Sequence, residues 1–343
     1  MKQKLVVLVL ALLVLLAGSV GEVRKRWAAP LDIPQGGFTL IVDKGDSLRK
    51  AANRLHQAGV LSFPQPIALY GRWTGLDQQI KPGEYLLPQG TTPESLLSLL
   101  QRGEVIQYQV TLPEGITLSR ALDILAEQAQ LETILSGADD DRILELIQPE
   151  SHPEGLFFPD TYLYSRGDTD LSILQQAHAA MLTTLEEEWP LRAEGLLYNS
   201  PYEALIMASI IERETGLAQE REQISGVFAR RLEQGMLLQT DPTVIYGLGE
   251  TFDGNLKRRH LTEDGNPYNT YRISGLPPTP IALPGRAAIH AALHPEEGSA
   301  LYFVARGDGG HVFSDTLKEH NRAVRQYQLQ RRQDYRSAPE KSP

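Results

Sequence analysis

The sequence predicts an α+β protein in three parts, namely an apolar N-terminal helix, a small α+β subdomain and a larger α+β domain. Three observations support this prediction. A nearly uninterrupted apolar run occupies Leu5–Val20. A strand, a glycine turn and a helix then recur three times. After Leu171 the apolar residues follow helical spacing. At 343 residues the chain is too long for one ordinary compact domain, so two or three are expected.

Charge and cysteine content exclude several classes of function. The chain carries 33 Lys+Arg against 43 Asp+Glu, a net charge of −10, and an acidic surface repels nucleic acid. The absence of cysteine excludes disulfides, Cys-ligated zinc, iron–sulfur clusters and a thiol nucleophile. The sequence also lacks an HExxH motif and a glycine-rich phosphate loop. We therefore expect no metal, no cofactor and no nucleic-acid partner.

The apolar N-terminal run is intermediate in length between a signal-peptide core and a full membrane span. It is flanked by basic residues: Lys2, Lys4, Arg24, Lys25 and Arg26. Because a basic cluster directly after the run resists translocation, we interpret residues 1–26 as an uncleaved transmembrane anchor. The alternative is a signal peptide cleaved near Ala17-Gly18-Ser19. With both flanks basic, charge alone does not decide the orientation.

Residues 27–36 are rich in proline and glycine and are interpreted as a linker. The three repeated units follow it. Strands are expected at 38–42, 84–87 and 107–112, and helices at 48–55, 93–100 and 118–125. In each unit a glycine supplies the positive φ of the turn, and a Ser or Thr caps the helix.

The first of these units, Val42–Leu48 followed by Ala51 and Ala52, resembles the opening of a LysM module. LysM modules bind N-acetylglucosamine polymers, and a small α+β adaptor without a ligand is the alternative. We place a LysM-like subdomain at 37–105, a catalytic domain at 106–328 and a flexible tail at 329–343.

The helix expected at 200–215 carries the candidate chemistry. Ser200–Glu203 reads as a capping box with proline at the first helical position, and Gly216 as a C-cap. Between them the sequence is apolar nearly all round, so the helix should be buried. Its last turn brings Glu212 and Glu214, one of which is a candidate acid.

Helix geometry separates these two carboxyl groups. Glu214 shares the face of Met207, Ile210 and Ile211, so desolvation should raise its pKa and let it donate a proton near neutral pH. Glu212 lies on another side and either faces the cleft or pairs with an arginine. For both, a solvated helix end paired with Arg213 is the structural alternative.

Several sequence blocks, in order, resemble the YceG-like (MltG-type) family of endolytic murein transglycosylases. They are Glu154–Tyr162 (EGLFFPDTY), Met207–Gly216 (MASIIERETG), Gln239–Gly247 (QTDPTVIYG), Tyr268–Tyr271, Gly275–Pro278, Pro284–Gly285, Leu301–Val304, Gly309–Phe313 and His320–Asn321. The resemblance extends from the N-terminal run to about Gln328. It implies a lysozyme-like catalytic helix whose acid is a Glu followed by Ser or Thr. Glu214-Thr215 matches this pair and Glu212-Arg213 does not, so Glu214 is the expected catalytic residue.

The resemblance also implies the reaction and its setting. One Glu cleaves the bond between N-acetylmuramic acid and N-acetylglucosamine, and a 1,6-anhydro sugar remains without use of water. The expected substrate is the glycan strand of nascent peptidoglycan, whose elongation the cut terminates. The enzyme is expected at the cytoplasmic membrane with its catalytic domain on the extracytoplasmic side, with cell-wall synthases as possible partners.

Seven residues of the matching blocks are expected to bind substrate: Gln239, Thr240, Asp241, Asn269, Tyr268, Tyr271 and Tyr162. The polar side chains suit sugar hydroxyls and N-acetyl groups, and the tyrosines suit sugar faces. Each has a structural alternative, because Thr240-Asp241-Pro242 is also a good helix start and tyrosines are often half-buried in a core.

Three other functions remain open. A non-catalytic peptidoglycan-binding tether for synthases would use the LysM-like region alone. A water-using muramidase would need a second carboxylate across the cleft, for which Asp241 and Asp160 are the candidates. A structural scaffold would explain the anchor but not the matched blocks.

Overall fold

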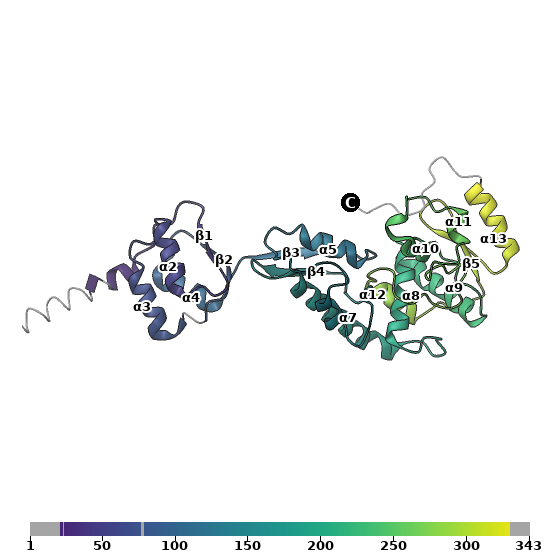
Figure 1. The fold of residues 1–343 in the computed structure, drawn as a ribbon, viewed down its shortest axis with the longest axis horizontal. Coiled ribbons are helices and arrows are strands. Elements are labelled where there is room, and N and C mark those ends of the chain that lie inside the picture. The colour runs from purple at the N-terminus through teal and green to yellow at the C-terminus, as the bar shows by residue number, and fades with distance from the viewer. Residues whose placement is uncertain (1–20, 23, 77–78, 330–343) are drawn as a thin grey trace, which may run out of the picture. The chain divides into compact units, whose positions relative to one another are not determined.

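The computed structural model describes residues 21–22, 24–76 and 79–329, and it confirms a mixed α+β fold with short two-stranded sheets (Figure 1). Most of the predicted anchor and nearly all of the predicted tail lie outside these residues. Within the described part of the chain, no helix has the length and apolar character needed to cross a bilayer.

The chain forms two compact units. The first contains residues up to Tyr108 together with Ala129–Glu132 and Leu163–Asp168. The second contains Gln109–Gln128, Thr133–Tyr162 and the rest of the chain from Thr169.

The first unit is built on two antiparallel strands, β1 (Phe38–Val42) and β2 (Gly83–Leu87). Its helices are α2 (Leu48–Gln57), α3 (Gln65–Thr74) and α4 (Pro93–Arg102). Apolar side chains from all five elements form one core. Helix α3 was not among the predicted elements. Its sequence includes Pro66 and Gly71, and only Ile67 and Gly71 are buried, so its helical pattern is weak.

The repeated strand–turn–helix pattern is confirmed in its details. Ser47, Thr92 and Thr117 are the N-caps of α2, α4 and α5 (Leu118–Ala126), and each hydroxyl accepts a hydrogen bond from the backbone N–H three residues on. The three turn glycines have positive φ: Gly45 at 82°, Gly90 at 88° and Gly115 at 75°. Strand β3 (Gln107–Thr111) begins as predicted and pairs with β4 (Thr161–Ser165).

The second unit is mostly helical. Helix α8 (Pro201–Glu214) packs against α9 (Arg221–Glu233), α10 (Asp241–Leu248) and α12 (Arg286–Leu293). Further α-helices of this unit are α6 (Asp141–Leu146), α7 (Asp170–Glu188), α11 (Arg258–Leu261) and α13 (Leu317–Val324). Strands β5 (Tyr302–Ala305) and β6 (His311–Ser314) form an antiparallel hairpin, and β5 contacts α9 and α13.

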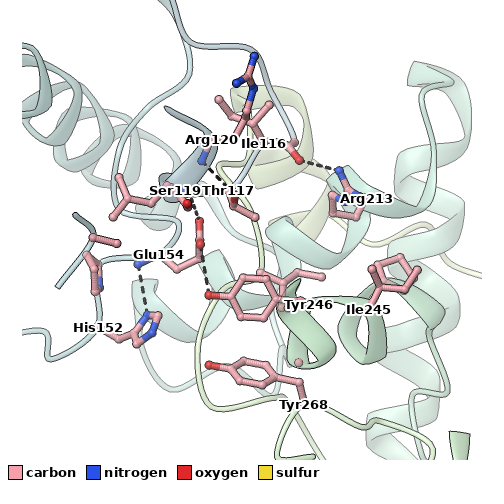
Figure 2. A pocket seen from close by; sticks show the side chains of 18 of the residues that line it. Ile116, Thr117, Ser119, Arg120, His152, Glu154, Arg213, Ile245, Tyr246 and Tyr268 are labelled. Atoms are coloured by element: carbon pink, nitrogen blue, oxygen red, sulfur yellow. Dashed lines mark hydrogen bonds between the residues drawn. The ribbon is translucent and has the colours of Figure 1, made fainter. Parts of the chain in front are cut away.

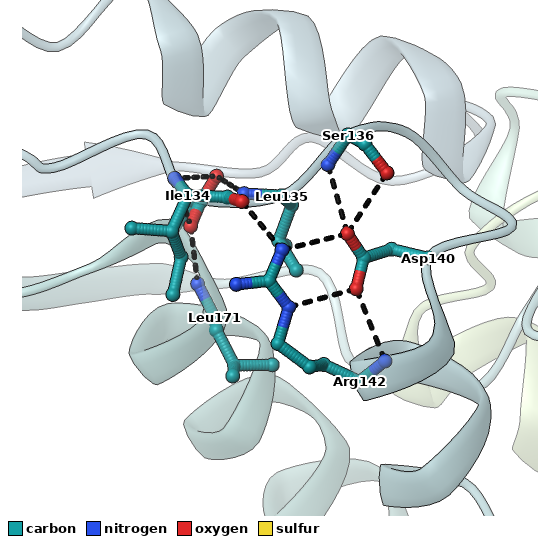
Figure 3. Close-up of polar contacts among 7 residues, drawn as sticks. Ile134, Leu135, Ser136, Asp140, Arg142 and Leu171 are labelled. Carbon is teal, nitrogen blue, oxygen red and sulfur yellow. Dashed lines mark hydrogen bonds and ion pairs between the residues drawn. The ribbon is translucent and has the colours of Figure 1, made fainter.

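The acidic run at residues 139–141 forms the start of helix α6, with Asp140 as its N-cap. Figure 3 shows the Asp140 carboxylate held between Ser136 and Arg142. It accepts hydrogen bonds from the backbone N–H and the hydroxyl of Ser136, both at 2.9 Å, and from the Arg142 guanidinium at 2.8 Å. The Arg142 side chain, more than any other group, holds the pKa of Asp140 well below its ordinary value.

Replacing Asp140 with Ala is expected to lower the melting temperature at neutral pH, because the ionised carboxylate binds five donors that would lose their acceptor. A depressed folded-state pKa means that this stabilisation is complete above the ordinary aspartate pKa of about 4 and fades as the pH falls below it. Thermal unfolding of wild type and variant at several pH values measures this. The two melting temperatures should converge in acid. Glu145→Ala, an exposed carboxyl on the same helix, is the control.

Candidate active site

Helix α8 begins with the predicted cap but not with the complete capping box. The Ser200 hydroxyl accepts from the Glu203 N–H at 3.2 Å, and Pro201 is the first helical residue. The Glu203 carboxylate, however, accepts from the backbone N–H of Asn199 at 2.6 Å rather than from that of Ser200. The cap therefore extends one residue further back than the sequence motif predicts.

Helix α8 ends differently from the prediction. The C-cap is Thr215, with extended backbone angles, and not Gly216. Residues Ala204 to Ile211 are all buried, as expected. The buried helix thus delivers its last turn directly into an extended segment, which leaves Glu214 as the final helical residue.

The extended segment after α8 is fixed by hydrogen bonds between Glu220 and His311. Glu220 accepts hydrogen bonds from the backbone N–H of His311 at 2.8 Å and contacts His311 Nδ1 at 2.7 Å. The Thr215 hydroxyl also donates to Glu220 at 3.4 Å and accepts from the Leu217 N–H at 3.0 Å. These contacts tie the residue after Glu214 to strand β6.

Glu212 is a structural carboxylate. Its side chain is 6% exposed, and it accepts hydrogen bonds from the Gly285 N–H at 3.0 Å and from the Arg221 guanidinium at 3.2 Å. The expectation of an arginine partner is met by Arg221, whereas Arg213 donates to the Gly115 carbonyl at 2.8 Å. Both Glu212 oxygens are therefore committed to protein groups.

Glu214 is half-buried and has a different environment. It accepts a hydrogen bond from the Thr240 hydroxyl. Burial raises the pKa of Glu214 to about 7; the nearby charge of Asp241 also raises it, while Thr240 and Arg231 oppose the shift. A carboxyl with this pKa is protonated in about half of the molecules at neutral pH, so it can donate and then accept a proton.

The partner of Glu214 comes from the start of helix α10. Thr240 is the N-cap residue of α10, but its side chain makes no capping hydrogen bond. An N-cap hydroxyl normally accepts from the first turn of its own helix, whereas this one donates to Glu214. Thr270 holds the turn instead, because its hydroxyl accepts from the Thr240 N–H at 3.0 Å. The Thr240 hydroxyl is thereby aimed at the carboxyl.

Asp241 and Tyr271 complete the surroundings of Glu214. The Tyr271 hydroxyl donates to the Asp241 carboxylate at 2.7 Å. Burial, followed by the charge of Asp241, raises the pKa of Tyr271, so the phenol stays protonated. Thr240, Asp241 and Tyr271, three of the seven predicted substrate residues, thus gather around the predicted acid.

Replacing Asp241 with Asn is expected to lower the pKa of Glu214, because it removes a negative charge that raises this pKa. A general acid must be protonated, so the decline of kcat on the alkaline side should move to lower pH. The pH profile of glycan cleavage measures the shift. Asp264→Asn removes the charge of an exposed carboxyl in the loop between α11 and Tyr271, and it should leave the pH profile unchanged. An identical profile for Asp241→Asn would contradict the electrostatic role.

Arg231 was not predicted from the sequence. It is 7% exposed, and its guanidinium donates to the backbone carbonyls of Leu301 at 2.7 Å and Leu238 at 2.8 Å. Its charge lowers the pKa of Glu214 and so partly offsets burial. One signal was available, since Arg231 continues the buried face of α9 at helical spacing from Ile224 and Phe228.

Gln239 precedes this cluster in an unusual backbone conformation. Its φ is 54°, a left-handed value that few residues other than glycine adopt. Its N–H donates to the Thr270 carbonyl at 3.1 Å, and its side chain is exposed. Strained residues of this kind occur often at functional sites, and the open side chain is available to a ligand.

Two of the predicted substrate residues are instead packed inside the protein. Asn269 is fully buried, and its amide group donates to the carbonyls of His260, Leu261 and Glu263. Tyr162 is 8% exposed, and its hydroxyl donates to the Phe158 carbonyl at 2.5 Å. Neither offers a free polar group or an open ring face, so the geometry favours the structural alternative for both.

Tyr268 lies in a pocket of about 800 Å³ with Glu154 at its centre (Figure 2). The Tyr246 and Tyr268 rings meet edge-to-face at 4.9 Å, and the Tyr246 hydroxyl donates to Glu154 at 3.2 Å. Glu154 also accepts from the Leu118 N–H at 2.9 Å, and burial raises its pKa to about 7. Arg213 and Pro242, the immediate neighbours of Glu214 and Asp241, line the same pocket.

Glu154 and Tyr246 were present in the matched blocks, but no role was predicted for either of them. Asp160, a predicted second carboxylate, is exposed and accepts from the Thr161 N–H at 2.7 Å, a local turn contact.

The arrangement around Glu214 provides one carboxyl poised between its two protonation states, one hydroxyl donor and one nearby carboxylate. Such a set supports proton transfer to and from a bound hydroxyl or ether oxygen.

The chain is similar to several known proteins. A family model described as the YceG-like family matches residues 40–326. An endolytic murein transglycosylase of Bacillus subtilis is 31% identical over 304 residues, which cover 83% of each chain. One of Streptococcus pneumoniae is 26% identical over 87% of this chain and 60% of that protein. The crystal structure of a putative YceG-like protein from Listeria monocytogenes is similar with a TM-score of 0.53 and 29% identity, covering 84% of this chain and 99% of that one.

Proposed function

The chain belongs to the YceG-like family, and on that premise we propose that it is an endolytic peptidoglycan lytic transglycosylase. The observation that carries the proposal is the state of Glu214. Glu214 is the last residue of a buried helix, its carboxyl accepts a hydrogen bond from the Thr240 hydroxyl, and its pKa is about 7. A residue that must act first as acid and then as base works best when its pKa lies near the working pH.

The reaction requires a single carboxyl. Protonated Glu214 gives its proton to the oxygen that joins N-acetylmuramic acid C1 to N-acetylglucosamine, and this C1–O bond breaks. The Glu214 carboxylate then takes the proton from the C6 hydroxyl of the muramic acid as its oxygen bonds to C1. The 1,6-anhydro ring closes, Glu214 is protonated again, and no water is consumed. The enzyme is therefore a lyase, and it needs no separate nucleophile of the kind that retaining glycosidases use.

Neighbouring residues have distinct parts in this proposal. Thr240 orients the Glu214 carboxyl, and Asp241, held by Tyr271, keeps the pKa of Glu214 high enough for proton donation. Gln239 and Tyr268 are assigned to substrate, because the first has an exposed side chain and the second lines an open pocket. Asn269 holds its own loop, next to Tyr268, against the carbonyls of residues 260–263, and Tyr162 bonds to the Phe158 carbonyl in the segment that follows Glu154.

The proposed setting is the outer face of the cytoplasmic membrane. Residues 1–26 would anchor the chain, and the first unit would contribute a LysM-like contact with glycan strands. Support for the anchor is the apolar run with its basic flanks, and support for the LysM-like contact is the resemblance at Val42–Leu48. Cutting nascent strands there would end their elongation, beside the synthases that make them.

The test is the chemistry of the product. Purified glycan strands are incubated with the full chain in detergent, and the new ends are identified by mass spectrometry. Internal cuts ending in 1,6-anhydro-N-acetylmuramic acid, 18 mass units lighter than a reducing end because water is not added, support the proposal. Reducing ends would indicate a water-using muramidase instead. Binding of strands without cleavage would indicate a tether.

A further inference from the structure

Helix α3 of the first unit exposes an apolar face. Trp73 is 85% exposed and Leu69 is 69% exposed, and Phe63, just before the helix, is 50% exposed. At 100° per residue Leu69 and Trp73 lie on one side of α3, whereas the buried Ile67 and Gly71 lie on the opposite side. Single exposed apolar residues are ordinary, but three large ones within eleven residues indicate a contact surface.

The N-terminal end of the described chain lies against this surface. The Arg26 guanidinium sits 4.0 Å from the centroid of the Phe63 ring, and the Trp27 ring lies 5.5 Å from that of Tyr70 on α3. The apolar run at residues 5–20 ends seven residues before Trp27. Seven residues span at most about 25 Å. The surface is thus within a short reach of the segment predicted to enter the membrane.

The surroundings of the apolar face are basic. Arg24, Lys25 and Arg26 are exposed on the helical segment at 24–28, and Arg72 is exposed on α3. Glu22 is the nearby acid, and it is already paired with Arg26 at 2.8 Å. In a chain of net charge −10, this local excess of positive charge favours an anionic partner. Anionic lipid headgroups are such a partner, and the predicted anchor would keep them within reach of this surface.

We propose that Phe63, Leu69 and Trp73, with Arg24, Lys25, Arg26 and Arg72, form a bilayer-docking surface. The apolar side chains enter the headgroup region of an anionic membrane, and the four cations bind its phosphates. Tryptophan beside arginine and lysine is the composition that interfacial segments share. This surface adds a second, peripheral contact to the proposed anchor and holds the first unit at the lipid surface.

The absence of cysteine in the chain permits a direct test. Leu69→Cys is made in the full chain, spin-labelled with a nitroxide and reconstituted into vesicles of phosphatidylglycerol and phosphatidylethanolamine. The matched control is Leu86→Cys, because Leu86 is 52% exposed on β2 of the same unit but outside the proposed surface. Oxygen relaxes labels that contact lipid, and a water-soluble nickel chelate relaxes labels in water. Circular dichroism checks that both labelled chains are folded.

The expected result is that oxygen is the stronger relaxant at position 69 and the nickel chelate at position 86. A label at position 69 that resembles the one at position 86 would overturn the proposal. Protection of position 69 from both reagents would also overturn it, because protein rather than lipid would then cover α3. In phosphatidylcholine vesicles the lipid signal at position 69 should weaken, and an unchanged signal would remove the role of the cations. The readout needs no cleavage, so it is separate from the test of the transglycosylase.

Discussion

Replacing Glu214 with Gln is expected to reduce strand cleavage by about 10²- to 10⁴-fold, the range that general acid–base catalysis contributes. The amide has nearly the same shape and can still accept a hydrogen bond from the Thr240 hydroxyl, but it has no acidic proton to transfer and no carboxylate to receive one. Fold and strand binding should persist, since removing a half-buried ionisable group relieves its desolvation. Release of 1,6-anhydro ends from purified strands, followed over time, measures the loss.

Glu212→Gln is the matched control for this experiment, since it makes the same change two residues away on the same helix. Its amide oxygen can still accept from Gly285 N–H or from Arg221, so most of the cleavage activity should remain. If cleavage survived in Glu214→Gln and disappeared in Glu212→Gln, the catalytic assignment would move to Glu212 while the reaction class stood.

Replacing Glu212 with Ala is expected to destabilise the fold by about 3–5 kcal/mol, the cost of removing one partner of a buried ion pair. Arg221, 12% exposed, would keep its charge in the interior, and the Gly285 N–H would lose its acceptor. Arg221 would keep only its longer contact with Glu114 at 3.8 Å, and its Nε already has no hydrogen-bond partner. Urea unfolding followed by circular dichroism gives the free energy of unfolding.

Glu222→Ala provides the comparison for stability, because Glu222 is an exposed carboxyl on α9 beside Arg221. Its change in unfolding free energy should stay within about 0.5 kcal/mol. A Glu212→Ala protein as stable as this control would mean that the pair with Arg221 is unimportant. Cleavage activity per folded molecule separates the two variants. Glu214→Gln should lose activity while its stability is kept, and Glu212→Ala should lose stability while its folded fraction remains active.

The two carboxyl groups of α8 also show how much of the candidate site could be predicted from the sequence. Helical spacing placed Glu214 on the face of Ile210 and Ile211 and assigned Glu212 to another side, and the burial-raised pKa of Glu214 agrees with that reasoning. The sequence did not indicate which arginine would pair with Glu212, because Arg221 belongs to the next helix, α9.

Some of the predicted substrate residues lie beside Glu214 and others are packed inside the protein, because distant segments again decide their contacts. Thr240 and Asp241 lie where the helix-start pattern put them, yet nothing local to Thr240 indicated that its hydroxyl would leave its own helix for Glu214. Asn269 has the residue type of a ligand contact, but three backbone carbonyls from the preceding loop occupy its amide. Residue type sets what a side chain can do, and its neighbours in space decide what it does.

By itself the sequence determined the family, the α+β class, the capped strand–turn–helix units and the buried helix that carries Glu214. These depend on residues a few positions apart, such as a Ser or Thr cap and the N–H three residues later. Only the tertiary structure decided the partners of Glu212 and Glu214, the burial of Arg231 and Asn269, and the exposure of Trp73 on α3. The hydrogen bonds of Glu212 and Glu214 join residues from 9 to 73 positions apart, and such pairings follow from how whole elements pack rather than from any local pattern.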